Sequence, residues 1–118
     1  MTNPKGQASI VIIGSYLVAL VMDVDRIPIT GETLLARNFR EAYGGKGSDM
    51  AVQAARLGAP VDFVGCVGDD DFGRAFSSLM VEEGVNIDHL KATSELATGA
   101  GFIIKDSGGH NIITIDIG

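Results

Sequence analysis

Hydrophobic residues occur along the chain in short β-branched runs, and stretches of helical periodicity follow them. The segments from Ser9 to Ile13 and from Val61 to Val67 are rich in valine and isoleucine, as is typical of strands buried on both faces in a parallel sheet. Small residues on one face predict a helix over about residues 47–58, and an apolar stripe predicts another over 71–83. This alternation predicts a parallel α/β fold with right-handed crossovers.

A second set of extended segments predicts a separate, smaller sheet. The stretches from Val18 to Arg26 and from Thr33 to Glu41 are separated by a turn sequence that contains proline and glycine. The stretches from Thr98 to Lys105 and from Asn111 to Ile117 flank a glycine-containing loop, which predicts a hairpin. We therefore expect segments of about 17–42 and 98–117 to form this sheet.

Composition and charge narrow the class of protein. The chain has 118 residues, of which 46% are hydrophobic, so it has the length and apolar content of one ordinary domain. Nine basic residues against 15 acidic ones give a net charge of -6, which argues against a nucleic-acid or anionic-membrane surface. Cys66 is the sole cysteine, which excludes a disulfide within the chain, and its apolar neighbours predict a buried side chain.

No targeting or membrane segment is predicted. The apolar run from Ile10 to Met22 is interrupted by Gly14-Ser15, and it is shorter than the roughly 20 apolar residues that a membrane span needs. We therefore expect a cytoplasmic, soluble protein.

The glycine-rich stretch Gly44-Gly45-Lys46-Gly47 is the strongest chemical signal. Glycines let the backbone approach a ligand closely, and the N-terminus of the helix that follows offers free N–H donors. The stretch is not a P-loop, because Arg40 stands where the first glycine of that motif would be. Taken alone, it fits a tight turn before a helix as well as it fits a ligand site. The run of aspartates at 69–71 lacks the spacing of an EF-hand loop and is better explained by helix capping than by metal binding.

Several motifs along the chain together resemble the N-terminal region of the ribokinase-like (PfkB) carbohydrate kinases. In order, they are Pro28-x-x-Gly31-Glu32-Thr33, Gly44-Gly45-Lys46-Gly47, Ala54-Ala55-x-Leu57-Gly58-Ala59, Val67-Gly68-Asp69-Asp70-x-Phe72-Gly73 and Thr98-Gly99. The resemblance extends from about Ile10 to Gly118. It implies that residues 1–118 are the N-terminal part of a parallel α/β sandwich, with the segments 17–42 and 98–117 inserted as a small β-sheet lid over the sugar.

The resemblance also implies a reaction and its partners. Members of the family phosphorylate a sugar hydroxyl with ATP and magnesium, and their general base and ATP pocket lie further along the chain than this sequence extends. We therefore expect the 118 residues alone to be inactive and to bind neither ATP nor magnesium. The expected partners are a small carbohydrate and a second copy of the chain that pairs through the lid. A non-catalytic module for sugar binding or protein pairing, and a fragment of a nucleoside kinase, are the alternatives.

The residues that the resemblance places at the sugar depart from the ribokinase pattern at three positions. The implied substrate-binding residues are Leu17, Ala19, Gly45, Lys46, Gly47, Asp49 and Gly101. Leu17 and Ala19 stand where the family has Asn and Asp, and Asp49 stands where it has Asn. A sugar hydroxyl that faced Leu17 or Ala19 would lose water without gaining a partner, at a cost of about 1–3 kcal/mol. The pattern therefore argues against ribose as the substrate, and it leaves three alternatives: a different carbohydrate, a nucleoside, or a pocket that has lost its function.

Overall fold

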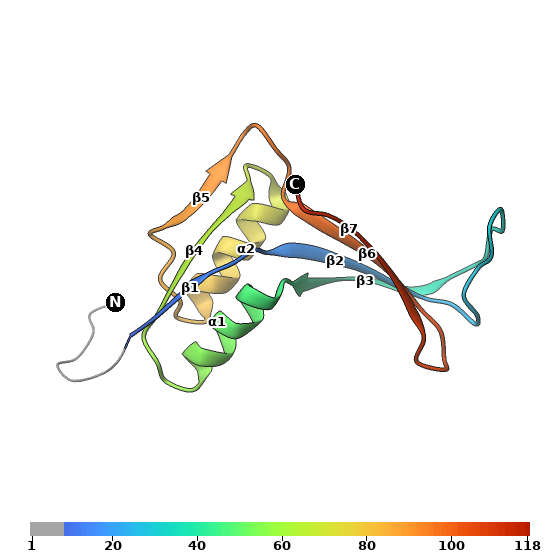
Figure 1. The fold of residues 1–118 in the computed structure, drawn as a ribbon, viewed down its shortest axis with the longest axis horizontal. Helices are drawn as coiled ribbons and strands as arrows, with labels where there is room; N and C mark the ends of the chain where they lie inside the picture. The colour runs from blue at the N-terminus through green and yellow to red at the C-terminus, as the bar shows by residue number, and fades with distance from the viewer. Residues whose placement is uncertain (1–8) are drawn as a thin grey trace.

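A computed structural model describes residues 9–118 as a body of strands and helices with a long β-sheet arm (Figure 1). Residues 1–8 of the predicted domain lie outside the described residues. The elements in chain order are β1 (Ile10–Ile13), β2 (Leu17–Asp23), β3 (Arg37–Gly44), α1 (Lys46–Arg56), β4 (Val61–Gly68), α2 (Asp71–Glu82), β5 (Leu90–Thr93), β6 (Gly99–Lys105) and β7 (Asn111–Asp116).

The body is a three-stranded parallel sheet in the order β1-β4-β5. The connection from β1 to β4 contains α1, and the connection from β4 to β5 contains α2. Both connections are right-handed crossovers, and both advance in the same direction across the sheet, from β1 to β4 to β5. The two helices therefore lie on the same face of the sheet. The core lies between them and the sheet, where Val61, Phe63, Phe76 and Met80 are fully buried. This confirms the predicted parallel α/β class.

The other face of this sheet has no covering layer within residues 9–118. Val11 and Ile13 of β1 are 60% and 81% exposed, and Cys66 of β4 is exposed as well. The prediction that the first strand is buried on both faces is therefore wrong for the described residues, and so is the prediction that Cys66 is buried. The physical reason is that alternate residues of a strand point to opposite faces, and the helices cover one face alone.

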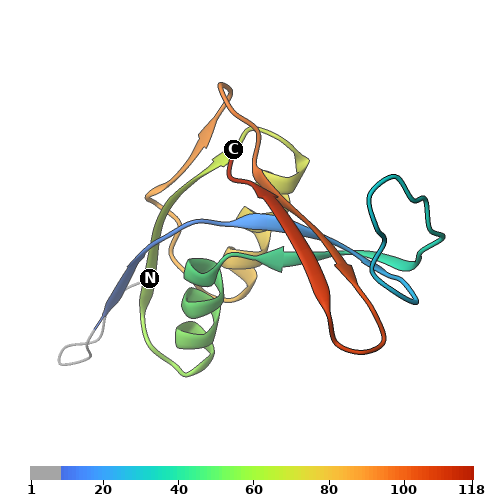
Figure 2. The same ribbon diagram turned by 45° about the vertical axis from the view of Figure 1, so that its right-hand side comes forward.

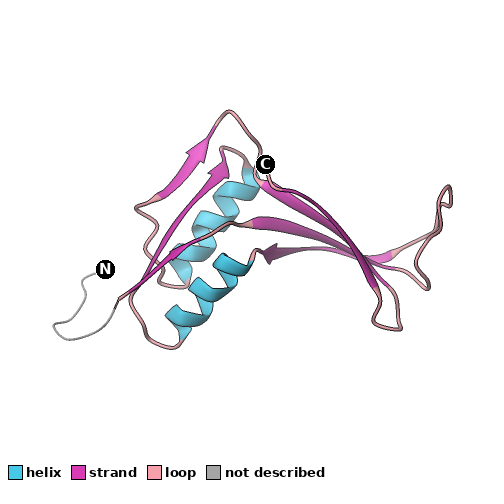
Figure 3. Cartoon of the chain, viewed as in Figure 1, coloured by secondary structure: helices cyan, strands magenta, loops and turns pink. Residues whose placement is uncertain are grey.

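The predicted smaller sheet is confirmed as a four-stranded sheet in the order β3-β2-β6-β7, which we call the lid sheet. Its central pair, β2 and β6, is parallel, and both outer pairs are antiparallel. The lid sheet leaves the body as an arm of strands and loops, which makes the molecule 58 Å long and 19 Å thick (Figures 2 and 3). The second lid strand begins at Arg37 rather than at Thr33, because the preceding loop is closed by bonds from Arg26 and from the amide of Ile29 to the Glu32 carboxylate.

The helix ends follow the residues that the sequence singled out. Asp70 is the N-cap of α2 and accepts a hydrogen bond from the amide of Gly73 at 2.8 Å. After α1, Gly58 has a φ of 92°, the left-handed conformation that favours glycine at a helix C-terminus. The predicted bounds of both helices agree with the structure to within a residue or two. In the described part of the chain, neither helix has the length and apolar character needed to cross a bilayer.

Candidate functional site

Several predicted site residues share one face of the lid sheet, which we call the small-residue face. Leu17 and Ala19 of β2 point to this face, because alternate residues of a strand do so. In the register of the sheet, Ala19 lies between Ala42 of β3 and Gly101 of β6. These three positions carry no side chain larger than a methyl group, but Leu17 and, from β7, Ile115 reach over Gly101, since a methyl group there would lie 3.3 and 3.2 Å from them.

Leu17 closes one end of this row. A methyl group at Gly101 would lie 3.3 Å from Leu17 Cδ1, and one at Gly44 would lie 2.8 Å from the same atom. The leucine side chain therefore fills the space that the two glycines leave open. Ala19 beside it is buried, with 6% of its surface exposed. The structure thus brings Leu17, Ala19 and Gly101 together and leaves that patch apolar.

The glycine-rich stretch lies where β3 ends and α1 begins. Gly45 has a φ of 93°, and a side chain on it would meet the carbonyl oxygen of Ser15. Gly47 lies against Gly14, since a methyl group on Gly47 would be 2.9 Å from the Gly14 Cα. Both glycines are therefore required by the local backbone whether or not a ligand binds. The alternative of a tight turn before a helix accounts for them without a ligand.

The first turn of α1 nevertheless has the features of an anion or hydroxyl site. No side chain caps its N-terminus, and the Ser48 hydroxyl donates to the carbonyls of Gly44 and Gly45 instead, at 2.5 and 2.8 Å. The helix therefore offers backbone donors to a ligand. The Lys46 side chain is exposed and forms no ion pair with any residue from 9 to 118.

Asp49 lies apart from the other predicted site residues. It is exposed in the first turn of α1 and lines a groove between α1 and α2. That groove is also lined by Tyr43, Val52, Gln53, Arg56, Leu79 and Glu83. Because Asp49, Val52, Gln53 and Arg56 share one helical face, Asp49 faces the second helix rather than the row of small residues.

A hydrogen-bond network, which no pattern in the sequence indicates, joins the body to the lid sheet. Thr98, directly before β6, donates to Asp70 from its hydroxyl at 2.6 Å and from its amide at 2.8 Å. The Thr98 hydroxyl in turn accepts a bond from the amide of Gly68 at 2.9 Å. The bonds from Thr98, with the one from Gly73, hold the pKa of Asp70 below its usual value. The network therefore links two of the motifs, Val67 to Gly73 and Thr98-Gly99, in space.

The comparison with known proteins points to one family. Residues 7–118 match the family described as pfkB family carbohydrate kinase. The chain is 36% identical over 110 residues to a ribokinase from Haemophilus influenzae, covering 93% of this chain and 36% of that protein. It is 39% identical over 111 residues to a ribokinase from Mus musculus, covering 94% of this chain and 34% of that protein.

Solved structures agree with this result. The ribokinase from Giardia lamblia matches with a TM-score of 0.86 and 37% identity, over 94% of this chain and 33% of that one. A ribokinase from Arabidopsis thaliana, solved in complex with ribose and ATP, matches with a TM-score of 0.82 and 29% identity, over 93% and 36%. The chain therefore spans about a third of the length of the relatives that it matches. On these matches, and on the lid sheet and glycine-rich helix start that accompany them, the chain belongs to the pfkB family of carbohydrate kinases.

Proposed function

We propose that this chain is the sugar-binding part of an ATP-dependent kinase that phosphorylates a hydroxyl group of a small carbohydrate. The observation that carries the proposal is the row of small residues Ala42, Ala19 and Gly101, beside a helix N-terminus that no side chain caps. A flat, hydroxyl-rich ring can lie against such a row and still reach the donors at the start of α1.

The proposed roles follow from the chemistry of each group. The backbone amides at Gly45, Lys46 and Gly47 are suited to donate hydrogen bonds to sugar oxygens, and the Lys46 ammonium adds a mobile charged donor. Asp49 contributes to the sugar site only if its side chain turns from the groove between the helices. Ala19 and Ala42 present nothing larger than a methyl group to the ligand, whereas Gly101 makes room for the side chains of Leu17 and Ile115.

The apolar patch bears on the substrate. Leu17 and Ala19 cannot form hydrogen bonds through their side chains, so hydroxyls that face them are not satisfied there. We expect the preferred substrate to face this patch with C–H groups, or with a position that lacks a hydroxyl group. Ribose should bind weakly. Solved relatives include ribokinases in complex with ribose and ATP or with ADP.

The nucleotide site is assigned to a part of the enzyme outside residues 9–118. Within these residues, no three His, Cys, Asp or Glu side chains are grouped so as to hold a metal ion. We therefore assign no contact to magnesium or to ATP here and derive no step of phosphoryl transfer. The uncovered sheet face at Val11, Ile13 and Cys66 is a surface that the remaining two thirds of such an enzyme is suited to cover, since parallel sheets are normally covered on both faces.

The proposal is tested by sugar binding and by turnover. In an amide NMR titration with a panel of pentoses, hexoses and nucleosides, we expect the largest shifts at Gly45, Gly47 and Gly101. Replacing Lys46 by Met should weaken binding by about tenfold, because a hydrogen bond to a charged group is lost. Lys91→Met, on exposed β5, is the matched control and should leave binding unchanged. Shifts confined to other residues, or an equal loss with the control, would contradict the assignment. Purified alone, the 118-residue chain should show no sugar-dependent ADP formation.

Pairing of two copies through the lid sheet is a further part of the proposal. The isoleucines of β7 support it, since Ile113 and Ile115 lie on the small-residue face and are each more than half exposed. Replacing both by Lys should dissociate a dimer in sedimentation velocity. Weak dimers form at protein concentrations of about 100 μM. A wild-type protein that is still monomeric at that concentration would contradict pairing.

A further inference from the structure

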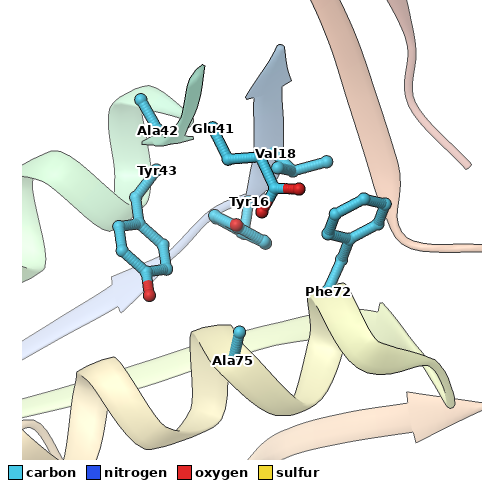
Figure 4. A pocket seen from close by; sticks show the side chains of 7 residues that line it. All are labelled: Tyr16, Val18, Glu41, Ala42, Tyr43, Phe72 and Ala75. Atoms are coloured by element: carbon cyan, nitrogen blue, oxygen red, sulfur yellow. The ribbon is translucent and has the colours of Figure 1, made fainter. Parts of the chain in front are cut away.

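A small cavity lies between the lid sheet and α2, apart from the sugar-site residues that the sequence predicted. Its volume is about 170 Å³. It is lined by Tyr16, Val18, Glu41, Ala42, Tyr43, Phe72 and Ala75 (Figure 4). Pockets for drug-sized ligands usually have about 300–1,000 Å³, so this cavity can hold a chemical group but not a whole nucleotide.

Three aromatic rings dominate the walls of the cavity. The ring centroids of Tyr16 and Tyr43 are 6.1 Å apart, with the rings inclined by 40°. Phe76 stacks on Tyr16 at a centroid distance of 4.0 Å, and Phe76 does not line the cavity. With Phe76 on one face and 5% of its surface exposed, Tyr16 contributes a small part of its ring to the cavity, and Tyr43, which is 49% exposed, contributes more. A cation is attracted to an aromatic face within about 6 Å of the centroid, so one cation can lie within range of both tyrosines.

The charges around the cavity are negative. Among the lining residues, Glu41 alone is charged, and Figure 4 shows its carboxylate directed between Tyr16 and Phe72. A wider groove shares Glu41, Phe72 and Ala75 with the cavity and adds Asp70 and Asp71, of which Asp71 pairs with Arg74 at 2.7 Å and Asp70 accepts three hydrogen bonds, so Glu41 is the main negative charge at the cavity. No Lys, Arg or His lines either space. An anion would be repelled here, whereas a cation would be attracted by both the carboxylates and the rings.

The state of Tyr16 is consistent with this field. Burial raises the pKa of Tyr16 to about 12, and the neighbouring side chains of Tyr43, Glu41 and Asp70 act in the same direction. Tyr16 is therefore a neutral phenol at neutral pH and presents an uncharged aromatic surface.

We propose that the cavity formed by Tyr16, Tyr43, Phe72 and Glu41 binds a compact organic ammonium group, such as a methylated ammonium. The rings supply the cation–π attraction and Glu41 supplies the counter-charge. A strongly hydrated inorganic cation is a poorer fit, because the aromatic walls offer no oxygen ligands in place of its water. The side chains of Tyr43 and Glu41 lie on the opposite face of the lid sheet from Ala19, and the cavity shares Ala42 alone with the proposed sugar site, so the proposal does not depend on the assignment of the substrate.

The chain itself provides a specific signal for the test. It contains two tyrosines and no tryptophan, and both tyrosines line the cavity. Tyrosine fluorescence of the 118-residue chain therefore reports on this site, and because Tyr43 also lines the groove between α1 and α2, the signal of Tyr16 in the Tyr43→Leu variant separates the two places. The probes are tetramethylammonium, choline and 3,3-dimethylbutan-1-ol, the last being the neutral isostere of choline. Far-UV circular dichroism confirms that each variant is folded.

Two pairs of variants separate the contributions of the ring and of the charge. Tyr43→Leu keeps an apolar side chain and should weaken choline binding by about 3- to 30-fold. Its control is Phe39→Leu on the same strand. Glu41→Gln should weaken binding by about 2- to 5-fold at low salt, and the difference should shrink as salt is added. Its control is the exposed Glu95→Gln. The Tyr43→Leu variant loses one of the two fluorescent tyrosines. Choline binding to it is therefore also followed by the NMR chemical shifts of the Phe72 ring protons, since Phe72 lines the cavity.

The expected result is saturable binding of both cations in the millimolar range, with the neutral isostere bound at least about fivefold more weakly. Equal binding of choline and its isostere would overturn the proposal, because the cavity would then be apolar without charge selectivity. The proposal would also be overturned if tyrosine fluorescence showed no saturable change at up to about 100 mM tetramethylammonium or choline. The same conclusion follows if the two control variants weaken binding as much as Tyr43→Leu and Glu41→Gln.

Discussion

Replacement of Asp70 by Ala should destabilise the protein by about 2–4 kcal/mol. Its carboxylate accepts hydrogen bonds from the Gly73 amide, the Thr98 amide and the Thr98 hydroxyl, at 2.8, 2.8 and 2.6 Å. Loss of an N-cap costs about 0.5–2 kcal/mol, and a hydrogen bond to a charged group is worth about 1.5–3 kcal/mol. The side chain is partly exposed and the terms are not additive, so we place the total well below their sum.

Two further variants separate the cap from the link to the lid sheet. Asp70→Asn retains a good N-cap residue but converts one acceptor oxygen to a donor, so it should lose about 1–2 kcal/mol. Thr98→Val removes the hydroxyl and leaves the buried Gly68 amide without its partner, at a cost of about 1–3 kcal/mol. Because Asp70 and Thr98 are in contact, a double-mutant cycle should give a coupling energy of about 1 kcal/mol or more.

Urea unfolding followed by circular dichroism measures these differences, and pH gives an independent check. The pKa of Asp70 is lowered from 3.8 in the folded protein. A carboxyl of this kind contributes stability above its unfolded pKa and loses it as the pH falls through the folded pKa. The difference in free energy of unfolding between wild type and Asp70→Asn should therefore stay constant above about pH 5 and shrink as the pH falls below about 4. A loss of less than about 0.5 kcal/mol with Asp70→Ala would refute the role of this network.

Two other predictions concern the glycine-rich stretch and the lid loop. Gly47→Ala should lower the free energy of unfolding by about 1–3 kcal/mol, because the new methyl group would meet the Gly14 Cα at 2.9 Å. Urea unfolding measures the loss, and Ser78→Ala at an exposed position of α2 is the control. Equal effects of the two substitutions would contradict the close approach. Glu32 should titrate near 2 rather than 4.5 in a carbon-detected NMR titration, since Arg26 and the Ile29 amide stabilise its carboxylate, and it should return toward 4.5 in Arg26→Gln. The loop contact is therefore present above pH 4.5 and is lost as the pH falls through about 2, and an unshifted Glu32 would disprove it.

The local features of the fold could be predicted from the sequence because their causes are local. The small-residue face of α1, the capping Asp70 and the left-handed Gly58 each act within a few residues, and the helix bounds agree accordingly. β5 was not predicted, since Leu90–Thr93 is short, half polar and formed by pairing with β4. Pairing of this kind depends on residues far away in the sequence.

Burial and long-range contacts were harder to predict for the same reason. A β-branched run such as Ile10–Ile13 indicates a strand but not which layers cover it, so Val11 and Cys66 were expected inside and lie exposed. The bond between Asp70 and Thr98 joins residues 28 positions apart. The cavity between Tyr16 and Phe72 likewise arises from the packing of distant elements, and no spacing in the sequence indicates it.

The central claim about the site is that Leu17 and Ala19 face the sugar. The measurement that tests it most directly is a calorimetric titration of ribose into the unmodified protein and into the double variant Leu17→Asn, Ala19→Asp, with folding checked in parallel because Ala19 is buried. Each new side chain would supply a missing hydrogen-bond partner, so the account predicts that ribose binds the variant about tenfold more tightly or better. Tight binding of ribose by the unmodified protein, or a folded variant that gains no affinity, would contradict it.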